Sequence, residues 1–566
     1  MADHNLDVLH TMHMIYAQRL NRRRLLQAAG ATTGAAILGG TLAGSPGRPP
    51  MRAMAQEEPK QGGTLIYAME SEADILDPQG ASGWVTWRIH RHIFEPLINQ
   101  DLSRSDVSQP PLIPGLAESW EVSPDGLAYT FKLRPGVTFH DGTPWDAEAA
   151  KFNIERMWNP DFEYYDARAA AFTYFCWLAT KEVQVVDPMT IRIVQSRPFG
   201  EFLNQMVQGT GGTGMISPAA ITQYGTDKVA EHPIGTGPFK FVERVQNEKI
   251  VLERNETYWG TKPHVDRIIF RPMPEPAARV NALRAGEVDF IAVPPPDSVQ
   301  SLVDEGYTLA ISDGRKVPHI WYIHLNMKDP VFEDVRVRQA IQHAIDKAGM
   351  ATSLLRDTAY RAEGLQAPGN LSFDPEFTIY PYDVERAKAL MAEAGHSDGL
   401  DQELVFQTST AGSGQLLPVP MMEWIQRDLE QIGIKIKIDA FEWITYIGMW
   451  SAGIPEGVHG MQFSWGQSSG YWLDFTANSA SATPGCCNIG SYSNPKVDEL
   501  FNAAFGEMDD AKRAELYKQA DKLLMEDAAF IPIVNDRAPY IMAPYVKGFV
   551  HAPEEAFDLT LVWLDN

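Results

Sequence analysis

The stretch 114–156 constrains the fold more strongly than any other part of the sequence. A turn over Ser123–Gly126 leads into Tyr129–Leu133, where apolar and polar residues alternate as they do in a half-buried strand. A further short strand is predicted over 137–140. Asp146 then stands at an expected helix N-cap, because apolar residues follow it at helical spacing, at Ala147, Ala150, Ile154 and Met157. The stretch therefore predicts strands followed by a helix.

Length and charge restrict the remaining possibilities. With 566 residues the chain is longer than one hydrophobic core usually serves, so two or three domains are expected. The formal net charge of −25 repels phosphates and anionic lipids, which argues against nucleic acid or a membrane surface as a partner. We expect a monomer that binds no nucleic acid.

Residues 1–55 have the features of an export signal. Asn21–Gln27 fits the twin-arginine pattern, Ala28–Gly44 is a weakly apolar stretch, and Ala53–Ala55 is an A-x-A cleavage site. No cysteine lies near that site, so a lipoprotein is not expected. The segment predicts a periplasmic protein exported by the twin-arginine route.

The order of residues in 114–156 resembles the segment LAxSWEVSxDGLxYTFxLRxGVxFHDGTP of the family 5 extracellular solute-binding proteins, the peptide- and nickel-binding receptors of ABC importers. Further segments resemble markers of the same family: Gly62–Leu65, Ile234–Phe239, Gly286–Asp289, Asp334–Asp346 and Tyr492–Asp498. The resemblance covers nearly the whole chain after the export signal.

The resemblance implies an α/β fold class, namely a two-lobed periplasmic-binding-protein fold of type II (cluster C), with an extra domain inserted in the first lobe. The expected limits are residues 56–96 with 234–312 and 530–566 for domain I, 97–233 for the inserted domain II, and 313–529 for domain III in the second lobe. Ile531–Ile533 is expected as the strand that returns to the first lobe. The lobes would close on a solute by hinge motion and present it to permease and ATPase subunits, without a covalent step or a cofactor.

The ligand loop departs from the family pattern. Dipeptide receptors hold the ligand's ammonium with a carboxylate and its carboxylate with an arginine, but Gln467 and Ser468 replace the acid here and Leu417–Pro420 replaces the arginine. We therefore expect a peptide-like or oligosaccharide-like solute without charged anchors. The predicted ligand-binding residues are Trp84, Trp87, Trp465, Gln467, Ser468, Tyr471, Trp472 and Asp474.

Two other functions are compatible with parts of the sequence. The pattern G-x-S-x-G at 466–470 would suit a secreted serine hydrolase using Ser468, although only His551 follows as a base. A sensory receptor with the same fold would differ only in its partner. The pattern G-x-G-x-x-G at 209–214 lacks a preceding strand and indicates a loop rather than a cofactor site.

Cysteine and histidine positions give no metal site. Cys176, Cys486 and Cys487 allow one disulfide and one free thiol, and the sequence does not decide which. The histidines, including His324 and His343, show no ligand spacing. No bound metal is expected.

Overall fold

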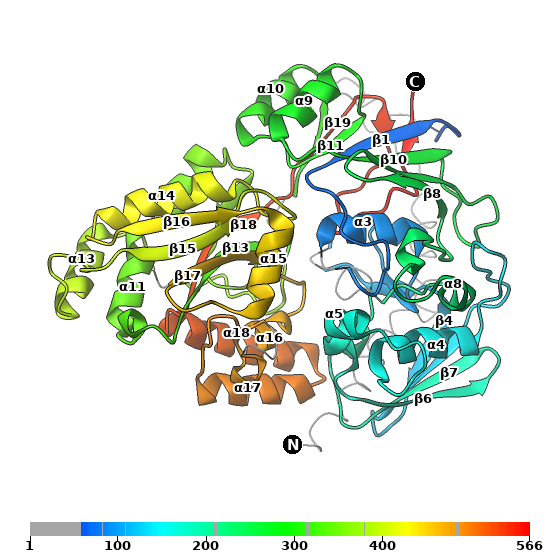
Figure 1. The fold of residues 1–566 in the computed structure, drawn as a ribbon, viewed down its shortest axis with the longest axis horizontal. Helices are drawn as coiled ribbons and strands as arrows, with labels where there is room; N and C mark the ends of the chain where they lie inside the picture. The colour runs from blue at the N-terminus through cyan, green and yellow to red at the C-terminus, as the bar shows by residue number, and fades with distance from the viewer. Residues whose placement is uncertain are drawn as a thin grey trace, which may run out of the picture.

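The structure is a computed structural model that describes residues 58–81, 83–107, 109–207, 213–312, 317–378, 380–482 and 487–566. The predicted export signal and most of the glycine-rich pattern at 209–214 lie outside these ranges. Two lobes lie side by side, and the chain passes between them more than once (Figure 1). No helix within the described ranges combines the length and the apolar character that crossing a membrane requires.

The first lobe is built on a seven-stranded sheet in the order β12-β19-β11-β1-β10-β9-β8. Its strands are β1 (Thr64–Met69), β8 (Phe239–Val245), β9 (Lys249–Arg254), β10 (Arg267–Pro272), β11 (Phe290–Ala292), β12 (Thr308–Ala310) and β19 (Tyr540–Met542). The helices α3 (Trp84–Ile93), α9 (Pro276–Arg284) and α10 (Val299–Asp304) accompany it, and β20 (Val546–Lys547) pairs with β21 (Trp563–Leu564). Central β1 is parallel to both its neighbours, β10 and β11.

A second, four-stranded sheet in the same lobe contains the stretch 114–156. Its order is β4-β5-β7-β6, formed by β4 (Ala117–Val122), β5 (Ala128–Leu133), β6 (Thr180–Asp187) and β7 (Thr190–Gln195). The other elements here are β2 (Ile98–Gln100), β3 (Leu112–Pro114), α4 (Ala147–Trp158), α5 (Ala167–Trp177), α6 (Phe202–Gln205) and α8 (Pro218–Tyr224).

Local chemistry explains how this stretch folds. Gly126 has φ 67° and closes the predicted hairpin turn, and the carboxylate of Asp146 accepts a hydrogen bond from the amide of Ala149 at the start of α4. The predicted strand over 137–140 is wrong, because this segment makes only a single bridge, between Thr138 and Pro144. Proline has no N–H with which to continue a ladder.

The second lobe has a six-stranded sheet in the order β14-β18-β13-β17-β15-β16. Its strands are β13 (Ile320–Leu325), β14 (Ala359–Arg361), β15 (Leu404–Ser409), β16 (Ile436–Phe441), β17 (Gly460–Trp465) and β18 (Phe530–Asp536). The helices are α11 (Val335–Ala344), α12 (Lys347–Gly349), α13 (Val384–Glu393), α14 (Pro418–Glu430), α15 (Trp443–Ala452), α16 (Trp472–Ala477), α17 (Pro495–Gly506) and α18 (Asp510–Glu526). All six residues of β13 are buried, as its unbroken apolar and aromatic run predicts.

The chain returns to the first lobe later than the sequence predicts. β18, which contains Ile531–Ile533, pairs with β13 and β14 in the second-lobe sheet, so its assignment as the returning strand is wrong. The first strand back in the seven-stranded sheet is β19, and only Arg537–Pro539 separates the two. The apolar pattern of the two strands is alike, so it cannot show which sheet each one joins. The other domain limits stay predictions.

The two lobes are packed against each other at one rim. The rings of Phe199 and Phe505 stack with centroids 4.6 Å apart, and the amide of Gly200 donates to the carbonyl of Phe505 at 3.1 Å. One cluster of buried apolar residues is continuous from the four-stranded sheet into the second lobe. The structure is therefore a closed arrangement of the lobes.

Candidate functional site

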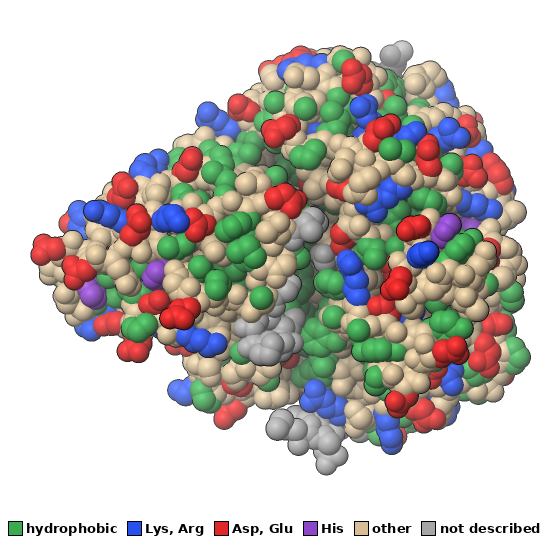
Figure 2. Space-filling model, viewed as in Figure 1, with side chains coloured by type: hydrophobic (Ala, Val, Ile, Leu, Met, Phe, Trp, Pro, Cys, Tyr) green, Lys and Arg blue, Asp and Glu red, His purple; other side chains and the backbone are tan. Residues whose placement is uncertain are grey.

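A cavity of about 470 Å³ lies between the lobes. The first lobe contributes residues from the start of α3 and from α5, and the second lobe contributes α15, β17 and the loop before α14. Figure 1 shows α5 and α15 on the facing sides of the two lobes. The cavity therefore exists only when the lobes face each other. Figure 2 shows the groove between the lobes, with hydrophobic side chains along it. The lining residues are Gly83, Trp84, Trp87, Ala171, Phe172, Tyr174, Phe175, Ser413, Trp443, Ile447, Trp450, Phe463, Ser464, Trp465 and Cys487.

Aromatic rings make up most of the walls. Trp84 and Trp87 meet edge to face with centroids 4.9 Å apart on the first-lobe side. On the second-lobe side Trp450 of α15 stacks on Phe463 of β17 at 4.2 Å. Such rings offer a ligand large, rigid apolar faces at little cost in conformational entropy.

Two glycines hold Ser413 at the cavity wall. Gly412 has φ 139°, and a Cβ on it would lie 2.4 Å from the ring of Trp443. Gly414 has φ 68°, and a Cβ there would lie 2.2 Å from the ring of His319. Neither contact leaves room for a side chain, so this loop fits between the two rings only with glycine on both sides of Ser413.

No described residue lining the cavity carries a formal charge. A buried charged side chain, His319, lies behind Ser464, whose hydroxyl accepts a hydrogen bond from His319 Nε2 at 2.6 Å and donates to the carbonyl of Gly414 at 2.5 Å. Ser464 thus has its hydrogen bonds satisfied within the protein. The cavity offers a ligand no ion-pair partner from its described walls.

His319 belongs to a buried ionic chain that links the lobes. Its Nδ1 lies 2.9 Å from Glu555 and 3.6 Å from Asp536, and Glu555 in turn pairs with Arg88 of α3 at 3.1 Å. Burial alone would lower the pKa of His319, but the charges of Glu555 and Asp536 raise it to about 10. His319 is therefore a histidinium at neutral pH.

The same three side chains, His319, Asp536 and Glu555, could between them offer a metal ion one ligand atom each, all within 4.8 Å of one another. In the structure Nδ1 of His319 faces both carboxylates, at 2.9 Å from Glu555 and 3.6 Å from Asp536. Arg88 supplies a second positive charge to Glu555. The cluster is best explained as an ion-pair network rather than as a metal site.

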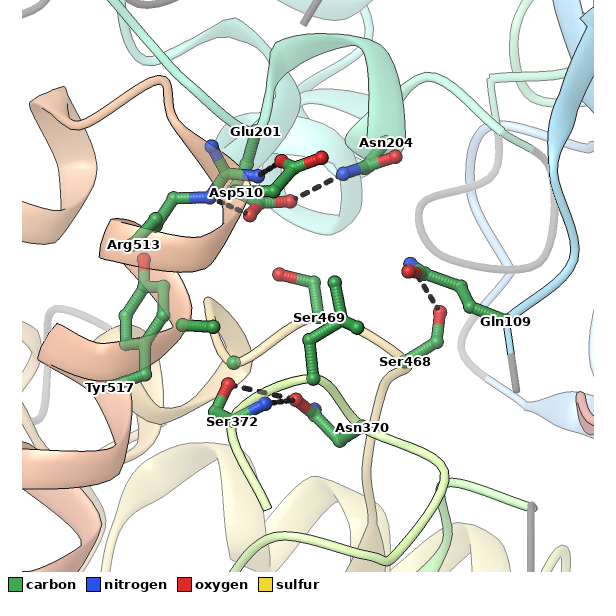
Figure 3. Close-up of a pocket in the computed structure, with 13 residues that line it drawn as sticks. Gln109, Glu201, Asn204, Asn370, Ser372, Ser468, Ser469, Asp510, Arg513 and Tyr517 are labelled. Carbon is green, nitrogen blue, oxygen red and sulfur yellow. Dashed lines mark hydrogen bonds and ion pairs between the residues drawn. The ribbon is translucent and has the colours of Figure 1, made fainter. Parts of the chain in front are cut away.

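A separate, smaller pocket of about 20 Å³ lies at the closed rim, large enough for one water molecule (Figure 3). Its polar walls come from both lobes: Arg513 of α18 donates to Glu201, just before α6, at 2.5 Å, and Gln109 donates to Ser468 at 3.4 Å. Glu201 also accepts a hydrogen bond from Asn204 at 2.9 Å. This pocket is a polar contact between the lobes.

The structure places the predicted ligand residues in three groups, at the large cavity, at the rim and in the packed core. The cavity is lined by Trp84, Trp87 and Trp465. At the rim, Ser468 lines the small pocket and Gln467 accepts a hydrogen bond from Gln205 at 3.4 Å.

Tyr471 and Trp472 lie in the packed core and do not line the cavity; Trp472 packs against Trp465 with centroids 6.4 Å apart. Asp474, in α16, accepts a hydrogen bond from Asn478 at 2.6 Å, and burial raises the pKa of Asp474 to about 6.

Sequence reasoning missed the aromatic residues of α5 and α15. Trp443 and Trp450 are seven residues apart, which places them on one face of α15, and this spacing is the signal that could have found them. Phe172 and Phe175, three residues apart in α5, show the same kind of spacing on the opposite wall. These residues supply more of the cavity than the loop at 466–474 does.

Ser468 has no arrangement for nucleophilic catalysis. Its side-chain partner is Gln109, and His551 directs both ring nitrogens to backbone carbonyls, of Ala552 at 3.1 Å and Ala538 at 2.7 Å. The next helix, α16, begins only at Trp472, so it does not place an N-terminal amide beside Ser468. The hydrolase interpretation is therefore wrong.

Comparisons with known proteins identify the family of the chain. The sequence profile described as "Bacterial extracellular solute-binding proteins, family 5 Middle" matches residues 111–481. The heme-binding protein A of Haemophilus influenzae is 31% identical over 460 residues, covering 78% of this chain and 82% of the relative. The chain belongs to family 5 of the bacterial extracellular solute-binding proteins.

Other relatives in and around family 5 extend the comparison. The glutathione-binding protein GsiB of Pectobacterium atrosepticum is 30% identical over 502 residues, covering 87% of this chain and 92% of the relative. The solved structure of an ABC transporter-associated periplasmic binding protein, DppA from Helicobacter pylori in complex with peptide STSA, superposes with a TM-score of 0.79 at 25% identity, covering 90% of this chain and 99% of that one.

Family 5 membership confirms the predicted family, fold class and function: this is a solute-binding protein of the ABC importer type and not an enzyme. Its relatives include periplasmic binding proteins.

Proposed function

We propose that this family 5 protein captures its solute in the aromatic cavity between the lobes and that closure of the lobes seals the solute there. The observation that carries the proposal is that α3 and α5 of the first lobe and α15 and β17 of the second lobe all contribute to one cavity. A ligand touching both lobes stabilises the closed form over the open form by its contacts with the second wall. The permease and ATPase subunits of an ABC importer are the partners that would receive the closed form.

The ligand class follows from the walls. The relatives bind glutathione and heme, and a further relative from Pseudomonas aeruginosa is a di/tripeptide-binding protein. Neither charged anchor of a dipeptide receptor stands at the described walls of this cavity, where Trp84, Trp87 and Trp465 present apolar faces. The proposal is therefore a peptide-like or oligosaccharide-like solute bound through apolar faces and hydrogen bonds, with import favoured over sensing because the relatives include a transporter-associated protein.

A binding screen tests the site. The mature protein, from Gln56 onward, is unfolded and refolded to remove carried-over solute and then mixed with a casein digest or with cello-oligosaccharides. Binding raises Tm and changes tryptophan fluorescence, since ligand binds only the folded state. Trp465→Ala should remove the response and Trp120→Ala, in the four-stranded sheet away from the cavity, should keep it. A response that survives Trp465→Ala would refute this site.

We also propose export by the twin-arginine route to the periplasm. The support is the pattern Asn21–Gln27 followed by the cleavage site Ala53–Ala55. Replacing Arg22 and Arg23 by lysine should leave the precursor in the cytoplasm, as measured by fractionation. Periplasmic protein in the lysine variant would show that another route is used.

A further inference from the structure

We infer that Gly83 sets the size of the largest solute that the closed lobes can enclose, because the missing side chain leaves room between the start of α3 and the loop at Ser413. This inference rests on the proposed function, since it assigns a specificity-determining position in the same cavity. The backbone, the packing and the helix start each allow a side chain at position 83, and the cavity is where that side chain would lie.

The backbone at position 83 does not require glycine. Gly83 has φ −123° and ψ 143°, which is extended backbone that any residue adopts. Gly412 and Gly414, on either side of Ser413 in the second lobe, have positive φ values of 139° and 68°. Backbone conformation therefore explains glycine at those two positions but not at position 83.

The packing around position 83 does not require glycine either. Beyond the chain neighbours, a Cβ on Gly83 would have one described heavy atom within 4 Å, the Cβ of Ser413 at 4.0 Å, which is an ordinary van der Waals contact. By contrast, a Cβ on Gly466, directly after β17, would lie 1.9 Å from the carbonyl oxygen of Pro318. A small side chain at position 83 therefore fits the closed protein.

The start of α3 would gain from a side chain. Gly83 is the N-cap of this helix and has no side chain with which to cap it. Asp, Asn and Ser are among the best N-cap residues, because their side chains accept a hydrogen bond from one of the first amides. Other helices of this protein begin in that way, at Asp146 for α4, Asp334 for α11 and Asp509 for α18. Helix stability therefore does not explain the glycine.

The cavity supplies the remaining explanation. Gly83 and Ser413 both line it and come from opposite lobes, so the position of a Cβ on Gly83 lies between the lobes. The walls around these two residues are mostly aromatic rings, including those of Trp84 and Trp465. A residue without a side chain therefore gives a solute width that the rings do not.

Hydrogen bonds hold the start of α3 in place. The amide of Trp87 donates to the carbonyl of Gly83 at 3.0 Å, and Trp87 Nε1 donates to the carbonyl of Ala81 at 3.2 Å. The hydroxyl of Thr86 donates to the carboxylate of Asp74 at 2.5 Å. Because these bonds resist a shift of the helix, a side chain added at position 83 takes its space from the solute.

Retention of solutes by size tests the inference. The refolded mature protein is mixed with a casein digest or with cello-oligosaccharides of mixed length and separated from free solute by gel filtration. The bound solutes are identified by mass spectrometry, and the largest and smallest of them are titrated by tryptophan fluorescence. Gly83→Leu should weaken the largest solutes at least about ten-fold, because an overfilled site is strained, and should affect the smallest much less.

A milder variant and a matched control accompany this one. Gly83→Ser should shift the retained solutes in the same direction by a smaller amount without lowering Tm, because serine is at least as good an N-cap as glycine. Gly448→Leu is the control: Gly448 lies in α15, which also contributes to the cavity, but it does not line the cavity, and a Cβ there has no described atom within 4 Å. It should leave the retained solutes unchanged.

The outcomes separate this inference from the proposed site. If both Gly83 variants retain the same solutes as the parent protein, or weaken large and small solutes equally, Gly83 does not set the size limit. If Trp465→Ala abolishes retention in that case, the cavity remains the site and only this inference has failed. If the parent protein retains nothing, or Trp465→Ala retains as much as the parent, the proposed function itself has failed, and this inference fails with it.

Discussion

The contact between Arg513 and Glu201 should set how strongly the lobes stay closed. The two side chains come from opposite lobes, are 5% and 3% exposed, and lie 2.5 Å apart (Figure 3). Opening the lobes would return both to water, so a change at this pair acts mainly on the closed form. Glu201→Gln keeps the shape of the side chain and removes its charge.

The structure gives the size of the effect. Removing one partner of a buried ion pair typically costs 3–5 kcal/mol, and the lower end, ~3 kcal/mol, applies here because Arg513 still has Asp510 as a partner. That energy corresponds to a change on the order of 100-fold in the ratio of closed to open protein. The control is Glu305→Gln, which removes an equally short pair with Arg284 inside the first lobe, 40% exposed on both sides. An exposed pair of this kind contributes about 0–1 kcal/mol.

Small-angle X-ray scattering of the ligand-free protein measures the outcome. Glu201→Gln should increase the radius of gyration as open molecules accumulate, whereas Glu305→Gln should match the parent protein. Adding a solute that binds should return the Glu201→Gln variant to the compact form, with a correspondingly weaker affinity. If the scattering and the affinity of Glu201→Gln are identical to those of Glu305→Gln, the Arg513–Glu201 pair does not stabilise the closed form.

Two further predictions concern stability. The charges of Glu555 and Asp536 raise the pKa of His319 from 6.5 to about 10, against the effect of burial. The contribution of this ion pairing to the free energy of unfolding is therefore complete below pH 6.5 and is lost as the pH rises through about 10. Urea unfolding across that range should show that His319→Gln is less stable than the parent protein near neutral pH and loses less stability as the pH rises. If the free energy of unfolding falls with pH as steeply in the variant as in the parent protein, the pH dependence does not come from His319. Gly414→Ala should lower the free energy of unfolding by at least ~2 kcal/mol, because its Cβ would overlap the His319 ring at a φ of 68°. Gly136→Ala, at φ 76° with open space around it, should cost only about 1 kcal/mol, and equal losses in the two variants would refute the clash.

Much of the fold could be predicted because local and global signals agree. The hairpin turn at Ser123–Gly126, the cap at Asp146 and the buried strand Ile320–Leu325 each depend on a residue type with one dominant structural role. The positions of Trp84 and Trp465 on facing walls followed from the family order of segments rather than from periodicity.

The rest of the site depends on contacts that a single sequence does not show. In helix α15 the seven-residue spacing indicates that Trp443 and Trp450 share a face, but the helix is apolar on nearly all sides, so no polar face shows that this side meets the cavity. Tyr471 and Trp472 follow Trp465 closely, yet they turn into the core because α16 packs against it. The return strand was misplaced for a similar reason: β18 and β19 are both apolar, and only pairing distinguishes their sheets.

The short passage from β18 to β19 has a consequence for rates. β18 is fixed in one sheet and β19 in the other, and the three residues Arg537–Pro539 between them cannot lengthen. We therefore expect opening to be a rotation near this passage, with the largest displacement at the rim where Arg513 meets Glu201. Substitutions at the passage should change how fast the lobes exchange between forms, and substitutions at the rim should change how long they remain shut. On the proposed function, the time a solute spends inside and the speed with which it is offered to a transporter would then be controlled at different places in the same molecule.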